Sequence, residues 1–205
     1  MQNSVSSPDR PLNAPALVNP PHVCPWWLGY LLASPVRRLF DQPSRVLAAH
    51  VRPGMTVLEP GPGMGFFTLE LARLVGSSGR VIAVDIQPRM LAALRRRAAK
   101  AGVLDRLDVR LAASDSLRLA DLEGTVDFTL AFAVVHELPA AASFFREVAR
   151  ASKRGARVLF VEPKGHVTAS LFETEMQAAR DAGFTLVERP SLRRSHTALL
   201  ALATS

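Results

Sequence analysis

The chain has little of what secreted or membrane-spanning proteins need. It contains a single cysteine, Cys24, in 205 residues, which excludes an internal disulfide framework. No stretch approaches the roughly 20 consecutive apolar residues that cross a bilayer, and the polar, proline-rich residues 1–25 contain no apolar signal core. We therefore expect a soluble, cytoplasmic protein without membrane insertion, whose length suits one main domain.

Acidic residues are outnumbered by basic ones. The formal net charge is +7, and the excess is overwhelmingly arginine. Such a balance could attract nucleic acid or an anionic substrate, or simply keep the protein soluble. Arg95–Arg97 lie within a predicted helix, where three consecutive residues fan over about 200° at roughly 100° per residue. We expect a solvated face there, with a phosphate or RNA contact as the alternative.

The most informative segment is Val57–Thr68, in which an apolar run ends in Glu59 and three glycines then alternate with other residues. Glycine permits positive φ and close approach of a ligand, and the helix that follows presents free N–H groups. We predict a strand, a tight turn and a helix that receive the polar end of a ligand. The spacing argues against the dinucleotide fingerprint G-x-G-x-x-G, because its sixth position is Phe66. Glu59 would repel a pyrophosphate and suits a cationic ligand.

Further carboxylates follow the next strands. Val81–Asp85 is a β-branched run that ends in an acidic residue 20 positions beyond Gly65. An acidic residue at that distance commonly accepts hydrogen bonds from ribose hydroxyls. Ser114 and Asp115 follow a third predicted strand after a short loop. The pattern places these side chains at the carboxyl edge of a parallel sheet.

Strand-like and helix-like segments alternate regularly from Pro43, so a domain is expected over residues 43–205. The alternation implies right-handed βαβ units and a parallel sheet covered on both faces, which is an α/β three-layer sandwich. Strands are predicted at 55–59, 80–85, 107–111, 126–132, 155–162, 184–189 and 196–202, and helices at 43–50, 66–75, 87–101, 139–152 and 168–182.

The order of strand, Glu-x-Gly-x-Gly-x-Gly, helix, strand and Asp resembles the class I, Rossmann-like S-adenosylmethionine-dependent methyltransferases over roughly residues 43–202. The resemblance implies a mostly parallel seven-stranded sheet whose last strand is antiparallel. It implies that Glu59 binds the methionine ammonium, directly or through water, and that Asp85 holds the ribose hydroxyls. The other cofactor-site residues that it implies are Gly61 and Gly63 along the methionine moiety, Gly65 for close helix–strand packing, Ile86 on the adenine, Asp115 on the adenine amino group, and Pro62, Ser114 and Ala131 nearby. An ordinary strand-to-helix turn is the alternative for the glycine segment alone.

The segment Ala131–Pro139, after the fourth strand, bears on the methyl acceptor. Enzymes that methylate exocyclic amino groups of nucleobases usually carry Asn or Asp, Pro, Pro and an aromatic there, and this motif is absent. The segment instead resembles the small-molecule branch that includes quinone-biosynthesis methyltransferases. His136 could accept a proton from a hydroxyl or orient the acceptor. Alternatively, it could serve only in helix-capping or loop packing at the carboxyl edge of the sheet. Glu137 equally suits the first turn of the following helix.

A second polar cluster, Glu162–His166, follows the fifth strand. Ligands of open α/β sheets collect beyond the carboxyl ends of the strands, so this cluster belongs on the same rim. Lys164 could bind an anionic substrate group, and Glu162 or His166 could serve as base; an ordinary solvent-exposed loop is the alternative. No metal is expected, because metalloid methyltransferases normally depend on several cysteines and Cys24 is alone.

The N-terminal region has two predicted parts. Residues 1–21 are polar and proline-broken, which is typical of a flexible arm. Residues 22–42 hold Trp26, Trp27 and Tyr30, which could form a lid over the acceptor or pack against the domain.

We therefore expect methyl transfer from S-adenosylmethionine to a small-molecule substrate, without nucleic acid as a partner. Transfer is an in-line displacement at a sulfonium carbon, for which alignment in a dry pocket can replace a strong base. An RNA methyltransferase and a cofactor-binding regulatory protein without transfer activity are the alternatives. The acceptor atom and the oligomeric state are left open.

Overall fold

The computed structural model describes residues 46–204. The predicted arm at 1–21 and the aromatic segment at 22–42, with Trp26, Trp27 and Tyr30, lie outside the described residues and stay predictions. Residues 46 and 47 are helical, within the range predicted for the first helix of the domain. No helix in the described part of the chain is both long and apolar enough to span a membrane.

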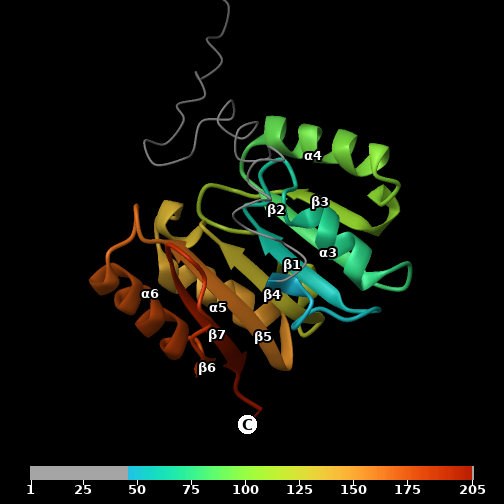
Figure 1. Cartoon of the computed structure of the whole chain (residues 1–205). Helices are drawn as coiled ribbons and strands as arrows, with labels where there is room; N and C mark the ends of the chain where they lie inside the picture. The colour runs from blue at the N-terminus through green and yellow to red at the C-terminus, as the bar shows by residue number, and fades with distance from the viewer. Residues whose placement is uncertain (1–45, 205) are drawn as a thin grey trace, which may run out of the picture.

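Seven strands form one central sheet (Figure 1): β1 (Thr56–Pro60), β2 (Arg80–Asp85), β3 (Leu107–Leu111), β4 (Val126–Phe132), β5 (Ser152–Pro163), β6 (Phe184–Glu188) and β7 (Ser195–Leu202). Their spatial order is β3-β2-β1-β4-β5-β7-β6. The first five strands are parallel, and β7 is antiparallel to both of its neighbours. This confirms the predicted sheet with an antiparallel last strand. At the β6 edge, the pairing with β7 shifts register between Leu186 and Glu188.

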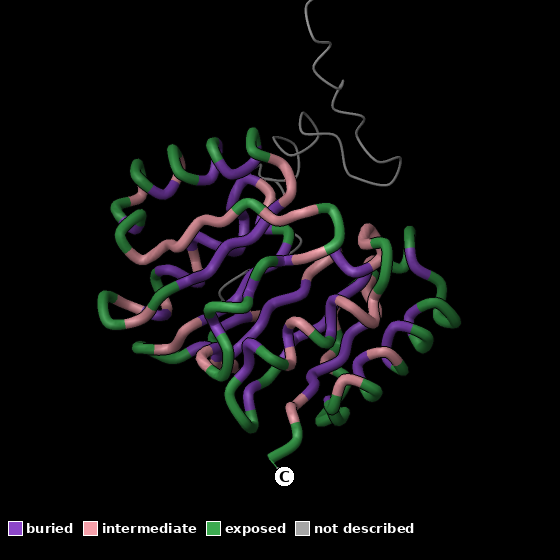
Figure 2. Tube along the Cα trace, turned by 180° about the vertical axis from the view of Figure 1, so that it is seen from behind, coloured by how far each residue is buried: buried purple, intermediate pink, exposed green. Residues whose placement is uncertain are grey.

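Helices pack on both faces of the sheet, which gives the expected three layers (Figure 1): α3 (Thr68–Val75), α4 (Pro88–Lys100), α5 (Ala141–Ala151) and α6 (Ala169–Asp181). Val57 on β1 belongs to the apolar cluster that includes α3, and the next residue, Leu58, belongs to the cluster that includes α5 and α6. Successive side chains of a strand point to opposite faces, so strands covered on both sides must be apolar throughout. Figure 2 shows this as buried strands between helices whose outer sides are exposed.

The observed elements start and stop close to the predicted positions, and the differences have local causes. The helix predicted from residue 66 begins at Thr68, because residues 63–67 form a turn. The helix predicted from 139 begins at Ala141, after Pro139. The strand predicted from 155 begins at Ser152, which pairs with Val126 before an irregularity in the ladder.

Candidate cofactor and acceptor site

Functional side chains gather where the parallel strands end. β1 ends just after Glu59 and β2 ends at Asp85, while Glu162 is the penultimate residue of β5. Neighbouring strands run in the same direction in close register, so these ends meet at one edge of the sheet. His136 lies in the short 3₁₀ helix η4 (Val135–Glu137), which directly follows β4 at the same edge. The structure therefore brings together the four polar residues on which the sequence interpretation depends.

The glycine loop, residues 61–65, has the backbone that its sequence predicts. Gly61, Gly63 and Gly65 have φ values of +66°, +54° and +87°, in the region that favours glycine. A Cβ on Gly61 would lie 2.7 Å from Cγ2 of Val134, and a Cβ on Gly65 would overlap Leu94. Gly65 thus permits close packing of the loop against α4, where the sequence predicted close helix–strand packing.

We expect Gly65→Ala to destabilise the domain by about 2–4 kcal/mol, because it adds both positive-φ strain and overpacking against Leu94. Urea denaturation measures the change. Gly165→Ala is the matched control: apart from its chain neighbours, no described residue has an atom within 4 Å of the added Cβ, and its φ is not left-handed. The free energy of unfolding should therefore change by less than about 1 kcal/mol. Equal losses in the two variants would contradict the packing role of Gly65.

Glu59 is a buried carboxylate that lacks a complete set of partners. Its side chain is 4% exposed, and Oε2 has no hydrogen-bond partner among the described residues. Burial raises the pKa of Glu59 to about 8, and the charge of Asp85 adds to the increase. The Thr68 hydroxyl is near enough to moderate the rise, although it too lacks a hydrogen bond in the described structure. A buried carboxyl group with one oxygen left without a partner is the group that a ligand ammonium would complete.

Asp85 ties the glycine loop to the start of α4. Its Oδ2 accepts from the backbone N–H of Gly63 at 3.3 Å, and its Oδ1 accepts from that of Gln87 at 2.8 Å. Burial raises the pKa of Asp85 to about 6, while these N–H donors oppose the rise. The two oxygens of a carboxylate together offer about four lone-pair sites, and the two N–H groups occupy two of them. The side chain can therefore still accept from ribose hydroxyls. The contacts to Gly63 and Gln87 thus leave the expected role of Asp85 toward ribose hydroxyls open to it.

The remaining predicted cofactor residues differ in accessibility. Ile86 is half-buried just beyond β2, and Ser114 and Asp115 are exposed in the loop after β3. Pro62 is buried, and Ala131 is fully buried within β4. The side chain of Ala131 therefore has no surface to offer a ligand, because it faces the core cluster that includes α5 and α6.

His136 is held by Glu162 across the ends of β4 and β5. Its Nδ1 lies 2.5 Å from Oε2 of Glu162, whose Oε1 accepts from the backbone N–H of Val135 at 2.8 Å. Glu162 is fully buried, and its hydrogen bond raises the pKa of His136, while burial of the imidazole opposes the rise. Ala133 turns the chain between β4 and η4 at φ +55°, which is uncommon for a residue other than glycine. The carboxylate thus fixes both the imidazole and the backbone that carries it.

The other predicted residues of the β5 loop are exposed at the same rim. The His166 ring packs edge-on to His136, with 5.7 Å between ring centroids. Lys164 is exposed, and its backbone N–H donates to the carbonyl of Arg194 at 3.0 Å. The structure therefore brings His166 next to His136 and places Lys164 two residues beyond Glu162.

Glu175, on α6, is a candidate that the sequence interpretation missed. It is 4% exposed, and its Oε2 has no hydrogen-bond partner in the described range. Burial raises its pKa to about 7; the charge of Glu162 adds to the rise and that of His136 opposes it. The sequence could have indicated this residue by its helical spacing, because a charged side chain stands there among apolar ones on one face. The buried residues of that face are Phe172, Glu175, Met176 and Ala179.

Comparisons with known proteins find similar domains. Residues 57–155 match the family model described as a methyltransferase domain. The chain is 30% identical over 150 residues to the ubiquinone/menaquinone biosynthesis C-methyltransferase UbiE of Marinomonas sp.. The matched region covers 70% of this chain and 57% of that protein. It is also 34% identical over 110 residues to the arsenite methyltransferase of Halobacterium salinarum, and this match covers 54% of this chain and 27% of that protein.

A solved structure extends the likeness to most of the chain. A SAM-dependent methyltransferase from Aquifex aeolicus superposes with a TM-score of 0.77 at 25% identity, covering 87% of this chain and 98% of that one. By contrast, the matched region spans only 27% and 57% of the two curated relatives. The fold, the glycine loop and these matches together are those of a methyltransferase domain, similar to the class I, Rossmann-like enzymes that use S-adenosylmethionine as methyl donor.

Proposed function

We propose that this protein transfers a methyl group from S-adenosylmethionine to a small-molecule acceptor in the cytoplasm, without membrane insertion or nucleic acid. The observation that carries the proposal is the shared sheet edge: the buried carboxylates Glu59 and Asp85 lie there together with the His136–Glu162 pair. One set of residues suits a cationic, ribose-containing ligand, and the other suits an acceptor beside it. The quinone-biosynthesis and arsenite methyltransferases that the chain matches are named for small acceptors, which supports this class.

On the cofactor side, each carboxylate has a separate task. Glu59 would pair with the methionine ammonium, and Asp85 would accept from the ribose hydroxyls while it holds Gly63. Ile86 would pack on the adenine, and Asp115 would accept from the adenine amino group. When bound, S-adenosylmethionine supplies an electrophilic methyl group on a sulfonium. The protein's contribution is then to hold that group and the acceptor atom close and in line.

On the acceptor side, His136 is the candidate base. Glu162 occupies Nδ1, so Nε2 is the nitrogen left to take a proton from a hydroxyl of the acceptor. His166 and Lys164 would lie beside the acceptor at the exposed rim of the sheet edge, where Lys164 suits an anionic group. The predicted lid of Trp26, Trp27 and Tyr30 would cover a planar acceptor.

Isothermal titration calorimetry tests the cofactor assignment. We expect S-adenosylmethionine and S-adenosylhomocysteine to bind and NAD not to bind. Asp85→Ala should weaken binding by about 1–3 kcal/mol, because it leaves ribose hydroxyls without an acceptor. Asp105→Ala, at an exposed position, is the control and should bind as the wild type does. Binding of NAD, or unchanged affinity in Asp85→Ala, would refute the assignment.

A further inference from the structure

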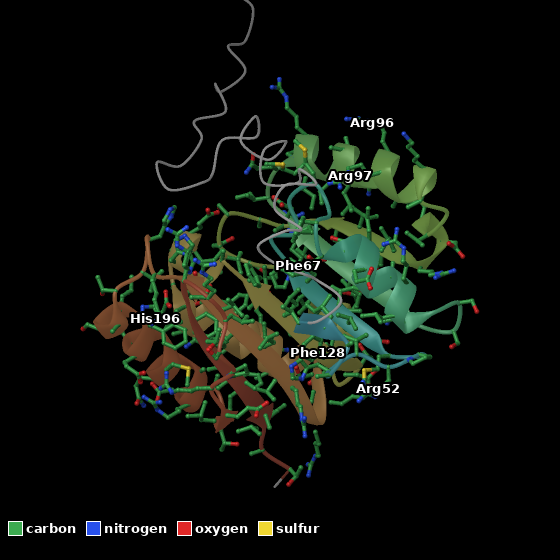
Figure 3. All side chains as sticks on the ribbon, in the orientation of Figure 1. Arg52, Phe67, Arg96, Arg97, Phe128 and His196 are labelled. Carbon is green, nitrogen blue, oxygen red and sulfur yellow. The ribbon has the colours of Figure 1, made fainter. Side chains whose placement is uncertain are left out.

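Three consecutive arginines on α4 have three different environments. Arg96 is exposed, as expected of a solvated face. Arg95 is also exposed, but its Nη2 donates to the carbonyl of Val109 on β3 at 2.8 Å. Arg97 is half-buried, and its Nη1 donates to the carbonyl of Met64, in the middle of the glycine loop, at 2.6 Å. Figure 3 shows Arg97 on the side of α4 that faces the domain and Arg96 on the other side. The expectation of a wholly solvated run is therefore wrong for Arg97.

The loop residue that Arg97 contacts is attached to α4 by its side chain as well. Met64 is 5% exposed and packs with Met90 and Ala93, both on α4. Its carbonyl belongs to the same peptide unit as the N–H of Gly65, which donates to the carbonyl of Pro62 at 2.9 Å. Both polar ends of the Met64–Gly65 peptide are thus hydrogen-bonded, so the peptide cannot turn over without breaking two bonds.

The orientation of this peptide affects the rest of the loop. Gly63, immediately before Met64, donates its N–H to Asp85. Loss of the Arg97 donor would leave a partly buried carbonyl without that partner, which favours a rearranged loop. Such a rearrangement would move Gly63 relative to Asp85 and change the surface that the methionine moiety would meet.

We propose that Arg97 is a positioning residue for the cofactor: it clamps the Met64 carbonyl and thereby holds the glycine loop in its binding conformation. The inference rests on the proposed function, in which this loop holds S-adenosylmethionine. Arg97 acts through the loop and does not itself need to touch the ligand. Its role is local, in contrast to a general attraction by the basic charge of α4.

The test compares Arg97→Met, Arg97→Lys and Arg96→Met with the wild type. Arg97→Met keeps an apolar stem and removes the donors, Arg97→Lys keeps one cationic donor, and Arg96→Met removes the same charge from an exposed position on the same helix. Hydrogen–deuterium exchange of residues 61–67 in the ligand-free protein reports the loop. Calorimetry reports the Kd for S-adenosylhomocysteine, and thermal denaturation reports the Tm.

We expect Arg97→Met to increase deuterium uptake in the loop and to raise the Kd about tenfold, as the loss of a charge-assisted hydrogen bond implies. Arg97→Lys should recover part of both effects, and Arg96→Met should leave both unchanged. Unchanged uptake and Kd in Arg97→Met, even with a lower Tm, would overturn the proposal, as would equal effects in Arg96→Met. If the wild type fails to bind S-adenosylhomocysteine, the proposed function fails, and the exchange data still decide whether Arg97 clamps the loop.

Discussion

Replacing Glu59 by Gln is expected to weaken S-adenosylhomocysteine binding by about 30-fold or more. The wild-type carboxylate is 4% exposed, and its Oε2 has no partner in the described structure, so a ligand ammonium would complete it. Neutralising one partner of a buried charge pair typically costs about 2–5 kcal/mol of binding free energy. Gln keeps the size of the side chain, so the loss reports the charge. Calorimetry at about pH 8 measures it, where the wild-type carboxylate is substantially ionised.

The affinity of the wild type should also rise with pH. Burial raises the pKa of Glu59 to about 8, so the ligand-free domain holds it mostly protonated at neutral pH. A bound ammonium favours the carboxylate and lowers this pKa, so binding releases a proton. The ionised fraction grows with pH, and the Kd should therefore fall on the order of tenfold between about pH 6.5 and pH 8. Asp85 has a pKa of about 6 and is largely ionised over that range.

Glu59→Gln should abolish this pH dependence as well as the proton release. The release is measured by repeating the titration in buffers with different ionisation enthalpies. Glu123→Gln, at an exposed position, is the control and should keep the wild-type pH profile. A wild-type Kd that does not change with pH would show that Glu59 is not the group that pairs with the ammonium.

The second large effect is expected at His136. If the acceptor is a hydroxyl, His136→Gln should lower kcat by about 100-fold or more, the usual contribution of a positioned base. The Glu162 hydrogen bond raises the pKa of His136, burial opposes it, and the charges of Glu137 and Glu175 add to the rise. A base must be neutral to accept a proton, so the rate should increase with pH through a midpoint above the ordinary histidine value of about 6.5. Glu162→Gln should move this midpoint lower and reduce the maximal rate, because the imidazole loses its orienting partner.

Initial rates with labelled S-adenosylmethionine and a panel of small hydroxylated aromatic compounds measure these effects. His166→Gln provides the comparison, because this exposed ring packs edge-on to His136 and is not part of the His136–Glu162 hydrogen bond. It should change the KM for the acceptor more than the pH profile. A wild-type rate that is independent of pH and unaffected by His136→Gln would mean that alignment alone drives transfer.

The fold was predictable because its elements have strong local patterns. Apolar strands such as Val81–Asp85 and amphipathic helices such as Ala141–Ala151 depend on periodicity over a few residues. The glycine loop was predictable for a similar reason, since positive φ at Gly61, Gly63 and Gly65 restricts the residue type. The antiparallel last strand followed from family resemblance and not from the residues of that strand.

Parts of the site were not predictable, because they depend on contacts between distant segments. The Met64 carbonyl that accepts from Arg97 is 33 residues away in the sequence, and nothing in the run Arg95–Arg97 distinguishes the arginine that turns toward the glycine loop. Glu162 was recognised as a polar residue after a strand, but its bond to His136 joins residues 26 positions apart. Glu175 stands in an apolar stripe, and the charges that affect it come from other elements.

The place of β7 in the sheet affects how the domain is made on the ribosome. β6 is synthesised before β7, yet β7 lies between β5 and β6 and is the neighbour through which β6 joins the sheet. During synthesis β6 therefore cannot pair with the sheet, and one edge of β5 stays unpaired, until residues 195–202 have left the exit tunnel. An expression fragment that stops before Ser195 would leave two strands without their hydrogen-bonding partner, although it deletes only one.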